Sequence, residues 1–206
     1  MPDHSENYIN QWLGYPLPIL SDLDTENQER RDIQPNIGKQ NGALLDFLIL
    51  LTRAKNVLEF GTCLGFSTIY LANALQKTGG HLTAIEFNER LFLETQVNLK
   101  KAKLSDIVTL VHADAAETLR TLEGPYDLIL QDSNKALYVP MLEDCLKRLR
   151  PGGILAADDT LFPVMNVPAD MKTQIHAYNQ AVFSHSNLRS TILPLGDGIT
   201  LSLKLS

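Results

Sequence analysis

The segment Asn56–Thr68, with the sequence NVLEFGTCLGFST, constrains the fold of this chain more than any other segment. A short apolar run ends at Phe60, Gly61 and Gly65 follow, and an apolar-periodic stretch begins at Ile69. This order predicts a buried strand, a tight glycine turn and a helix. Glycine permits a positive φ and a close approach to a ligand, and the first N–H groups of the helix point at whatever lies over the turn.

The same order of strand, breaker and helix repeats along the chain. Strands are expected at 56–60, 81–86, 107–112, 126–131 and 154–157, and helices at 42–53, 67–77, 88–102, 115–122, 139–150 and 169–183. This repetition predicts an α/β fold with a doubly wound, mostly parallel sheet. Two further β runs, at 190–195 and 199–203, flank a glycine-rich turn, which predicts a C-terminal antiparallel hairpin.

The length of 206 residues favours one domain spanning residues 1–206. Residues 1–32 are polar with scattered aromatic side chains, and we expect a short helix followed by a loop there. Two interpretations of this N-terminal arm stay open, a solvated extension and a lid over the substrate.

Charge and cysteine content narrow the functional classes. The net charge of −6 and the pI of about 5.3 argue against nucleic acid as a partner, because nucleic-acid-binding surfaces are usually basic. Cys63 and Cys145 do not suggest a disulfide framework, which favours a reducing compartment. The chain shows neither a signal-peptide pattern at its start nor an apolar run of the ~20 residues that span a bilayer. We therefore expect a cytoplasmic protein that does not bind a membrane.

Polar residues at the strand ends are candidates for ligand binding, because open α/β sheets bind ligands outside the carboxyl ends of their strands. Glu86 ends the second expected strand and suits the two hydroxyls of a ribose; alternatively, it is an acid near the start of the next helix. Asp114 and Ala115 follow the third strand. The carboxylate of Asp114 can accept from an adenine amino group while nearby N–H groups face the ring, or it can cap the next helix.

Three carboxylates follow the fourth and fifth expected strands: Asp132, Asp158 and Asp159. Packed together without a partner, they would repel one another and raise one another's pKa. A divalent cation relieves this repulsion, and oxygen ligands without a Cys or His cluster point to Mg²⁺, or to Ca²⁺ or Mn²⁺. In the alternative interpretation, the acids are a helix cap and a turn residue, and Lys135 is an ordinary ion-pair partner.

Two motifs carry a resemblance to a known family. Glu59, Gly61 and Gly65 form an E-x-G-x-x-x-G arrangement that resembles the first motif of class I methyltransferases that use S-adenosylmethionine. Asp132-x-x-Lys135-x-x-Tyr138, followed by Asp158-Asp159, resembles the metal-dependent O-methyltransferases, the group of catechol and caffeoyl-CoA O-methyltransferases and their small bacterial relatives. The resemblance covers about Ile33 to Lys204 and implies a Rossmann-like sheet of seven strands.

The resemblance implies a role for each matched residue. Lys135 matches the proposed general base, and Asp132, Asp158 and Asp159 match the metal ligands. The expected cofactor site consists of Glu59, Gly61, Gly65, Ser67, Glu86, Asp114, Ala115 and Asp132. In the family, the acid at Glu86 holds the ribose, and the glycine turn with the hydroxyl of Ser67 surrounds the methionine part. The resemblance also suggests a homodimer.

Two departures from the family pattern stand out. The segment after the fourth strand is usually Asp-Ala-Asp-Lys or similar and is Asp132-Ser133-Asn134-Lys135 here, which keeps the ligand and base positions. The second ligand after the fifth strand is usually asparagine and is Asp159 here, which adds a negative charge. The acid that helps to hold a catechol in the mammalian enzyme has no clear match, so catechol itself is not implied.

We therefore expect methyl transfer from S-adenosylmethionine to a hydroxyl of a small molecule, most readily one of two vicinal phenolic hydroxyls, with help from a divalent metal. Expected walls of the acceptor pocket are Trp12, Tyr15, Phe162 and Met165. The alternatives are a methyltransferase for nucleic-acid or protein nitrogen, an NAD-dependent oxidoreductase, and a non-catalytic cofactor-binding protein. The missing G-x-G-x-x-G fingerprint argues against the oxidoreductase.

Overall fold

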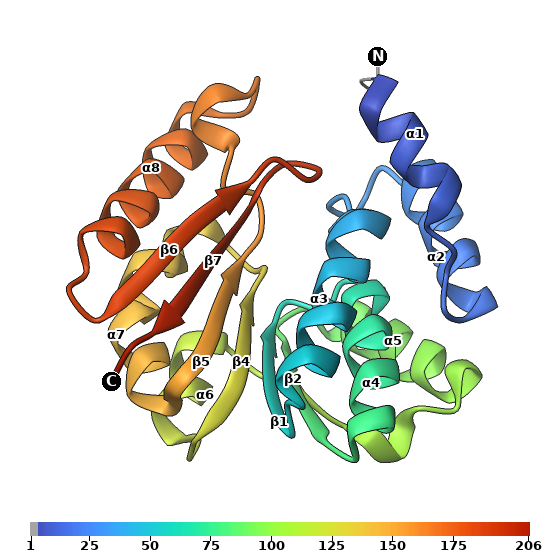
Figure 1. Cartoon of the computed structure of the whole chain (residues 1–206). Helices are drawn as coiled ribbons and strands as arrows, with labels where there is room; N and C mark the ends of the chain where they lie inside the picture. The colour runs from blue at the N-terminus through green and yellow to red at the C-terminus, as the bar shows by residue number, and fades with distance from the viewer. Residues whose placement is uncertain (1–3) are drawn as a thin grey trace.

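A seven-stranded sheet organises the chain in the computed structural model, which describes residues 4–206 (Figure 1). The strand order is β3-β2-β1-β4-β5-β7-β6. The strands are β1 (Asn56–Phe60), β2 (His81–Glu86), β3 (Val108–His112), β4 (Tyr126–Gln131), β5 (Leu149–Ala157), β6 (Leu188–Leu193) and β7 (Ile199–Lys204). The strands β1 to β5 pair in parallel, whereas β7 pairs antiparallel with β5 and β6. The predicted fold class and its C-terminal hairpin are confirmed.

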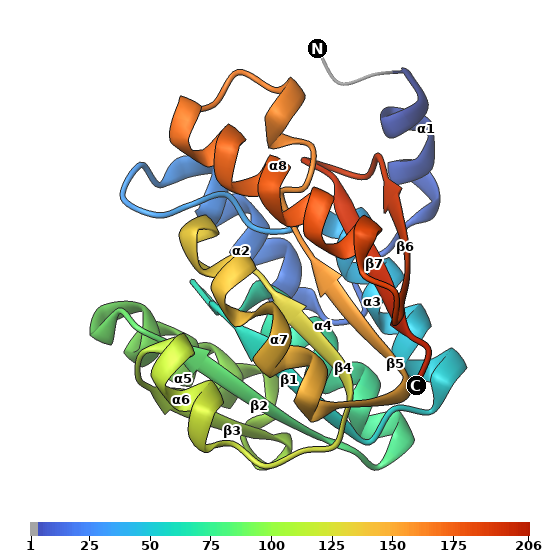
Figure 2. The same ribbon diagram turned by 90° about the vertical axis from the view of Figure 1, so that its left-hand side faces the viewer.

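Helices cover both faces of the sheet, as Figures 1 and 2 show. The helices are α1 (His4–Trp12), α2 (Pro18–Glu29), α3 (Gly38–Thr52), α4 (Phe66–Thr78), α5 (Glu89–Ala102), α6 (Ala115–Thr121), α7 (Tyr138–Arg148) and α8 (Ala169–Ser184). Helices α2 to α5 pack on one face, and α6, α7 and α8 pack on the other. Within the described residues, none of these helices combines the length and apolarity that crossing a membrane requires.

The alternation of side chains along the strands divides the core into two layers. Val57 of β1 belongs to the apolar cluster under α4, while Leu58 and Phe60 belong to the cluster under α7. This division follows from the period of two in a strand, which sends neighbouring side chains to opposite faces. Glu59 falls on the α4 side by the same rule and is fully buried there.

The N-terminal arm contains more helix than expected. The sequence predicts a short helix followed by a loop, but the charge-rich stretch after Pro18 forms the helix α2. Pro18 occupies the start of this helix, where its missing N–H costs nothing, and the spacing of the buried Leu20 and Leu23 gives the helix an apolar face. The prediction gave too much weight to the charges, which lie on the solvent side of an amphipathic helix.

The fifth strand is longer than expected and begins at Leu149, before the Pro151-Gly152-Gly153 sequence. Leu149 pairs with Tyr126, and the register then shifts before Leu128 pairs with Ile154. Gly152 has a φ of +72°, a conformation that favours glycine. The prediction treated this sequence as a simple helix breaker, whereas it forms an irregularity inside a strand.

The switch point of the sheet lies between β1 and β4, because the chain leaves β1 toward β2 and later returns on the other side. Backbone hydrogen bonds continue the sheet ladder past the strand ends: Asp132 N–H donates to the Phe60 carbonyl at 3.0 Å, and Asp158 N–H donates to the Gln131 carbonyl at 3.1 Å. These bonds hold the predicted metal ligands at one edge of the sheet.

A glycine is required where the β1 turn meets the β4 turn. Gly61 has a φ of +87°, and a Cβ atom on it would lie 2.1 Å from the Asp132 carbonyl oxygen. Replacement by alanine adds left-handed strain and an overlap with backbone, so we expect Gly61→Ala to lower the free energy of unfolding by more than about 2 kcal/mol. Urea denaturation measures this loss.

Gly14→Ala is the matched control, because nothing lies within 4 Å of a Cβ atom at Gly14. We expect this control to change stability by less than about 0.5 kcal/mol. Equal urea midpoints for the two variants would contradict the close approach at Gly61.

Candidate active site

A cavity of about 840 Å³ opens at the carboxyl ends of the central strands. This volume lies within the range of small-molecule sites, roughly 300–1,000 Å³. The cavity brings together eight predicted site residues, which are Gly61, Ser67, Glu86, Asp114, Ala115, Asp132, Lys135 and Asp159. The predicted residues Glu59, Gly65 and Asp158 are not among its walls.

The carboxylate of Glu86 is fixed by the glycine turn of β1. Its Oε2 accepts the backbone N–H groups of Thr62 at 2.9 Å and Cys63 at 3.1 Å, and its Oε1 accepts the N–H of Asn88 at 2.8 Å. The side chain of Asn88, not that of Glu86, caps α5 by accepting from Leu91 N–H. Glu86 therefore presents an oriented carboxylate to the cavity, as a ribose-binding acid requires.

Asp114 takes the capping role and lies in a position that is compatible with the other role that the sequence left open. Its side chain caps α6 by accepting the N–H of Glu117 at 2.9 Å, which agrees with the capping interpretation. Asp114 and Ala115 also line the cavity, so the same carboxylate lies where a ligand can reach it. The cap fixes the side chain before any ligand arrives.

Glu59 and Gly65 act from behind the cavity wall. Gly65 has a φ of +87° and stands at the N-terminus of α4, where a Cβ atom would lie 3.1 Å from the Thr95 methyl group. Glu59 is fully buried, and burial raises its pKa to about 8. The nearby hydroxyls of Ser67 and Thr68 temper this rise, and within residues 4–206 the Glu59 oxygens accept no hydrogen bond. A direct contact of Glu59 with a cofactor stays a prediction.

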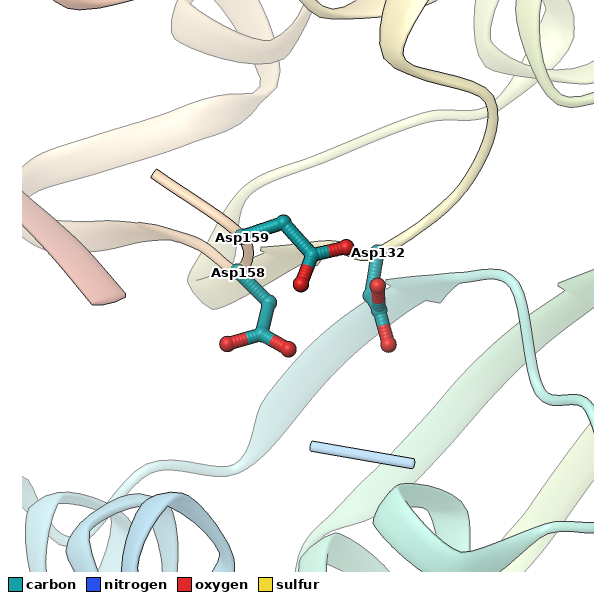
Figure 3. Close-up of side chains that lie close together, drawn as sticks. All are labelled: Asp132, Asp158 and Asp159. Atoms are coloured by element: carbon teal, nitrogen blue, oxygen red, sulfur yellow. The ribbon is translucent and has the colours of Figure 1, made fainter. Parts of the chain in front are cut away.

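The three predicted metal ligands lie together in the structure (Figure 3). Asp132, Asp158 and Asp159 each place a carboxylate oxygen within 4.8 Å of the others. Burial raises the pKa of Asp158 well above its usual range, and the charges of Asp132 and Asp159 raise it further. Burial also raises the pKa of Asp132, despite the opposing charge of Lys135.

The ammonium of Lys135 lies among three acceptors. Its Nζ is 2.6 Å from Asp159 Oδ2, 3.2 Å from Asp132 Oδ1 and 2.9 Å from the hydroxyl of Tyr138. Burial works against the charged form, but Tyr138, Asp132 and Asp159 together raise the pKa of Lys135 well above its usual value. In this arrangement Lys135 is protonated and compensates part of the carboxylate charge.

The donor set fits a hard divalent cation. One ammonium cannot neutralise three carboxylates, and burial, together with the charges of neighbouring carboxylates, raises the pKa of Asp132 and of Asp158. Oxygen ligands at this density are typical of Mg²⁺, Ca²⁺ or Mn²⁺ sites. In the alternative interpretation Lys135 is an ordinary ion-pair partner, and its described ion pairs reach Asp132 and Asp159.

The backbone explains which residues suit position 159. Asp159 has a φ of +64°, in the left-handed region. Among residues other than glycine, asparagine and aspartate adopt this backbone conformation most readily. The departure from asparagine to aspartate thus keeps the backbone geometry and changes the charge.

Sequence reasoning missed several residues of the site. The segment 34–37 and the α2 residues Leu23 and Asn27 line the cavity, although no motif marks them. Tyr138, which the motif included without a role, donates its hydroxyl to the Gln131 carbonyl and accepts from Lys135. Tyr138 therefore fixes the lysine to the strand ends.

Of the four residues predicted as walls of the acceptor pocket, one lines the cavity. Phe162 lines the cavity, whereas Trp12, Tyr15 and Met165 do not. Trp12 is 72% exposed, and Tyr15 packs edge-on against Phe66 and donates to Asp24. The prediction selected large apolar residues near the expected loops, and the packing of the N-terminal arm directs two of them elsewhere.

Comparison with known proteins identifies the family. The family described as O-methyltransferase matches residues 14–205. The chain belongs to the O-methyltransferase family. A catechol O-methyltransferase of Niastella koreensis is 32% identical over 164 residues, which cover 76% of this chain and 72% of that protein. A caffeoyl-CoA O-methyltransferase of Stellaria longipes is 28% identical over 174 residues, with 77% and 72% covered.

A solved structure supports the fold of this O-methyltransferase. The O-methyltransferase TomG from Streptomyces achromogenes, in complex with S-adenosylmethionine, matches with a TM-score of 0.85 and 24% identity, over 99% of this chain and 97% of that chain. The predicted enzyme class, an S-adenosylmethionine-dependent O-methyltransferase, is confirmed by the family. The alternative of an NAD-dependent oxidoreductase is thereby excluded.

The buried acid of this O-methyltransferase predicts a pH dependence of stability. Burial raises the pKa of Glu59 in the folded protein to about 8, above the ordinary glutamate pKa of 4.5. The protonated acid therefore stabilises the fold fully below about pH 4.5, and this contribution is lost as the pH rises through about 8. We expect Glu59→Gln to remove this loss of stability, which is on the order of 1.4 kcal/mol per pH unit between about pH 4.5 and 8. Urea denaturation of the ligand-free protein across this range measures it.

Glu123→Gln is the matched control, because Glu123 is exposed. This surface variant should keep the wild-type slope of stability against pH. A Glu59→Gln variant with that same slope would show that Glu59 is ionised in the folded protein.

Proposed function

We propose that this O-methyltransferase transfers the methyl group to one of two vicinal phenolic hydroxyls of a small molecule, assisted by Mg²⁺, or by Ca²⁺ or Mn²⁺. The observation that carries the proposal is the cluster of three carboxylates and Lys135, in which Asp132, Asp159 and Lys135 line the same cavity as the glycine turn. Relatives named catechol O-methyltransferase, caffeoyl-CoA O-methyltransferase and flavonoid 3′,5′-methyltransferase support a phenolic acceptor.

The residues of the β1–β2 half of the cavity would hold the donor. Glu86, fixed by the turn, accepts from the ribose hydroxyls, and Asp114 with the N–H of Ala115 faces the adenine. Gly61 and Ser67 line the part of the cavity next to Asp132, which suits the methionine moiety. S-adenosylmethionine supplies a methyl group that its sulfonium already activates.

Asp132, Asp158 and Asp159 would hold the divalent cation. When bound, the cation supplies a Lewis acid that lowers the pKa of the acceptor hydroxyl and orients the acceptor. With Asp132 and Asp159 serving as ligands, the ammonium of Lys135 would be stabilised less, so the pKa of Lys135 would fall and the ammonium could release a proton to solvent. The neutral Nζ amine of Lys135 would then take the proton of the acceptor hydroxyl.

The surroundings of Lys135 suit an aromatic acceptor. Phe162 is largely buried, lines the cavity and lies with its ring centroid 5.9 Å from Lys135 Nζ. Met171 lines the same part of the cavity. These apolar side chains exclude water and position a planar ring beside the base.

The N-terminal arm contributes to the cavity, which favours a lid over a solvated extension. Leu23 and Asn27 of α2 line the cavity, and Arg30 at the end of α2 lies 2.5 Å from Glu94 of α5. This ion pair joins the arm to the helix that follows the ribose-binding Glu86. The homodimer suggested by the resemblance stays a prediction that analytical ultracentrifugation would test.

Removal of divalent metal should abolish methyl transfer, because the carboxylates alone supply no Lewis acid. We expect dialysis against a chelator to reduce turnover of a vicinal diphenol to the background rate, and added Mg²⁺ to restore it. A radiolabelled methyl-transfer assay measures both steps. Full activity in the chelated protein would reject the metal-assisted mechanism.

Replacement of Lys135 should separate catalysis from binding. Lys135→Met removes the proton acceptor, so we expect kcat to fall on the order of 10²–10⁴-fold, with little change in the affinity for S-adenosylmethionine. The affinity for Mg²⁺ should not fall, because the ammonium no longer competes for Asp132 and Asp159. Steady-state kinetics measures kcat, and calorimetry measures the affinities for S-adenosylmethionine and Mg²⁺.

Lys135→Arg is the matched control for charge. Arginine keeps the positive charge but does not release its proton near neutral pH, so this variant should be as inactive as Lys135→Met. Retention of kcat within tenfold in either variant would show that Lys135 is not the base. Transfer to RNA in preference to a panel of phenols would instead favour the nucleic-acid alternative.

A further inference from the structure

A buried asparagine contacts one of the three clustered carboxylates. Asn41, in the first turns of α3, donates from Nδ2 to Asp158 Oδ1 at 3.0 Å. Asn41 is 1% exposed and Asp158 is 5% exposed, so the bond is shielded from water. The two residues are 117 positions apart in the sequence, and no motif connects them.

The orientation of the Asn41 amide follows from its surroundings. The same Nδ2 donates to the Leu195 carbonyl at 3.4 Å, so both neighbouring groups are acceptors and require the NH₂ side of the amide. Gly42 brings the helix close to α4, because a Cβ atom there would lie 2.6 Å from the ring of Tyr70. The helix carrying Asn41 is therefore held in place independently of the bond to Asp158.

The bond limits what the carboxylate of Asp158 can do. One oxygen is engaged by the amide, and the rotation of the carboxylate is fixed by a buried donor. Residues that donate hydrogen bonds to metal ligands orient those ligands and influence which metal the site binds. We propose that Asn41 is a positioning residue that makes Asp158 a ligand through one oxygen, and thereby favours Mg²⁺ over Ca²⁺ at the Asp132–Asp158–Asp159 site.

The coordination chemistry of the two cations supports this step. Mg²⁺ is small, takes six ligands and binds carboxylates through single oxygens, whereas Ca²⁺ takes 6–8 ligands and readily accepts both oxygens of one carboxylate. A carboxylate that turns freely can serve either ion. A carboxylate held by Asn41 loses the two-oxygen mode that stabilises Ca²⁺. The inference rests on the proposed metal-assisted function and concerns which ion the site selects.

Calorimetric titration of the metal-free protein with MgCl₂ and with CaCl₂, without donor or acceptor, tests the proposal. We expect Asn41→Leu, which has a similar volume and no donor, to raise the Kd for Mg²⁺ about 10–100-fold. The Kd for Ca²⁺ should rise less, so the preference for Mg²⁺ should narrow. Asn41→Ala, whose smaller side chain cannot overpack the site, should also reduce the preference for Mg²⁺ over Ca²⁺.

Asn73→Leu is the matched control. Asn73 is a buried asparagine of α4 that is 8% exposed, and its Nδ2 has no hydrogen-bond partner within the described residues. This variant should leave both metal affinities unchanged. A purely structural role for Asn41 would weaken Mg²⁺ and Ca²⁺ binding by the same factor, and that result would overturn the proposal, as would unchanged affinities.

Difference infrared spectra of the wild-type protein provide a test that needs no variant. Addition of Mg²⁺ should produce the wide splitting of carboxylate stretching bands that a one-oxygen ligand gives. Narrow splitting alone, the mark of two-oxygen binding, would overturn the proposal. If neither cation binds the wild-type protein, the proposed metal-assisted function fails; if Mg²⁺ binds equally well to wild type and Asn41→Leu, the inference alone fails.

Discussion

The mutual repulsion of three carboxylates at the ends of two neighbouring strands is the constraint on which the site depends. Asp132, Asp158 and Asp159 lie close together in a largely buried place, where charge is costly. Lys135 compensates part of this charge in the described arrangement. The same lysine is the proposed base, so under the proposal a bound cation would take over the charge balance and free Lys135 for proton transfer.

The backbone, rather than the side chains, brings these groups together. The parallel ladder runs past the ends of β4 and β5, so Asp132 and Asp158 are held by backbone hydrogen bonds before any ligand is present. Gly61 allows the β1 turn to touch the backbone of Asp132, so the glycine turn and the first of the clustered carboxylates lie side by side. A methyl donor and its acceptor must approach closely, and the proposed donor and metal sites are neighbours for this reason.

Elements far from the motifs complete the site. Helix α3 contributes Asn41, and the N-terminal arm contributes a wall of the cavity and an ion pair to α5. Tyr138 fixes Lys135 to the carbonyl of Gln131. No motif at the strand ends marks these groups, yet they orient the residues that the motifs contain.

The sequence by itself determined the order of strands and helices, the glycine turn and the residues at the strand ends, because periodicity, breakers and local spacing are properties of neighbouring residues. It also placed Asp132, Lys135 and Asp158 in one site, since parallel strands end at a common edge. Tertiary structure alone decided that Glu59 lies behind the cavity, that residues 34–37 form a wall, and that Asn41 holds Asp158. Contacts between segments more than 100 positions apart depend on how helices pack on the sheet, and no local pattern encodes that packing.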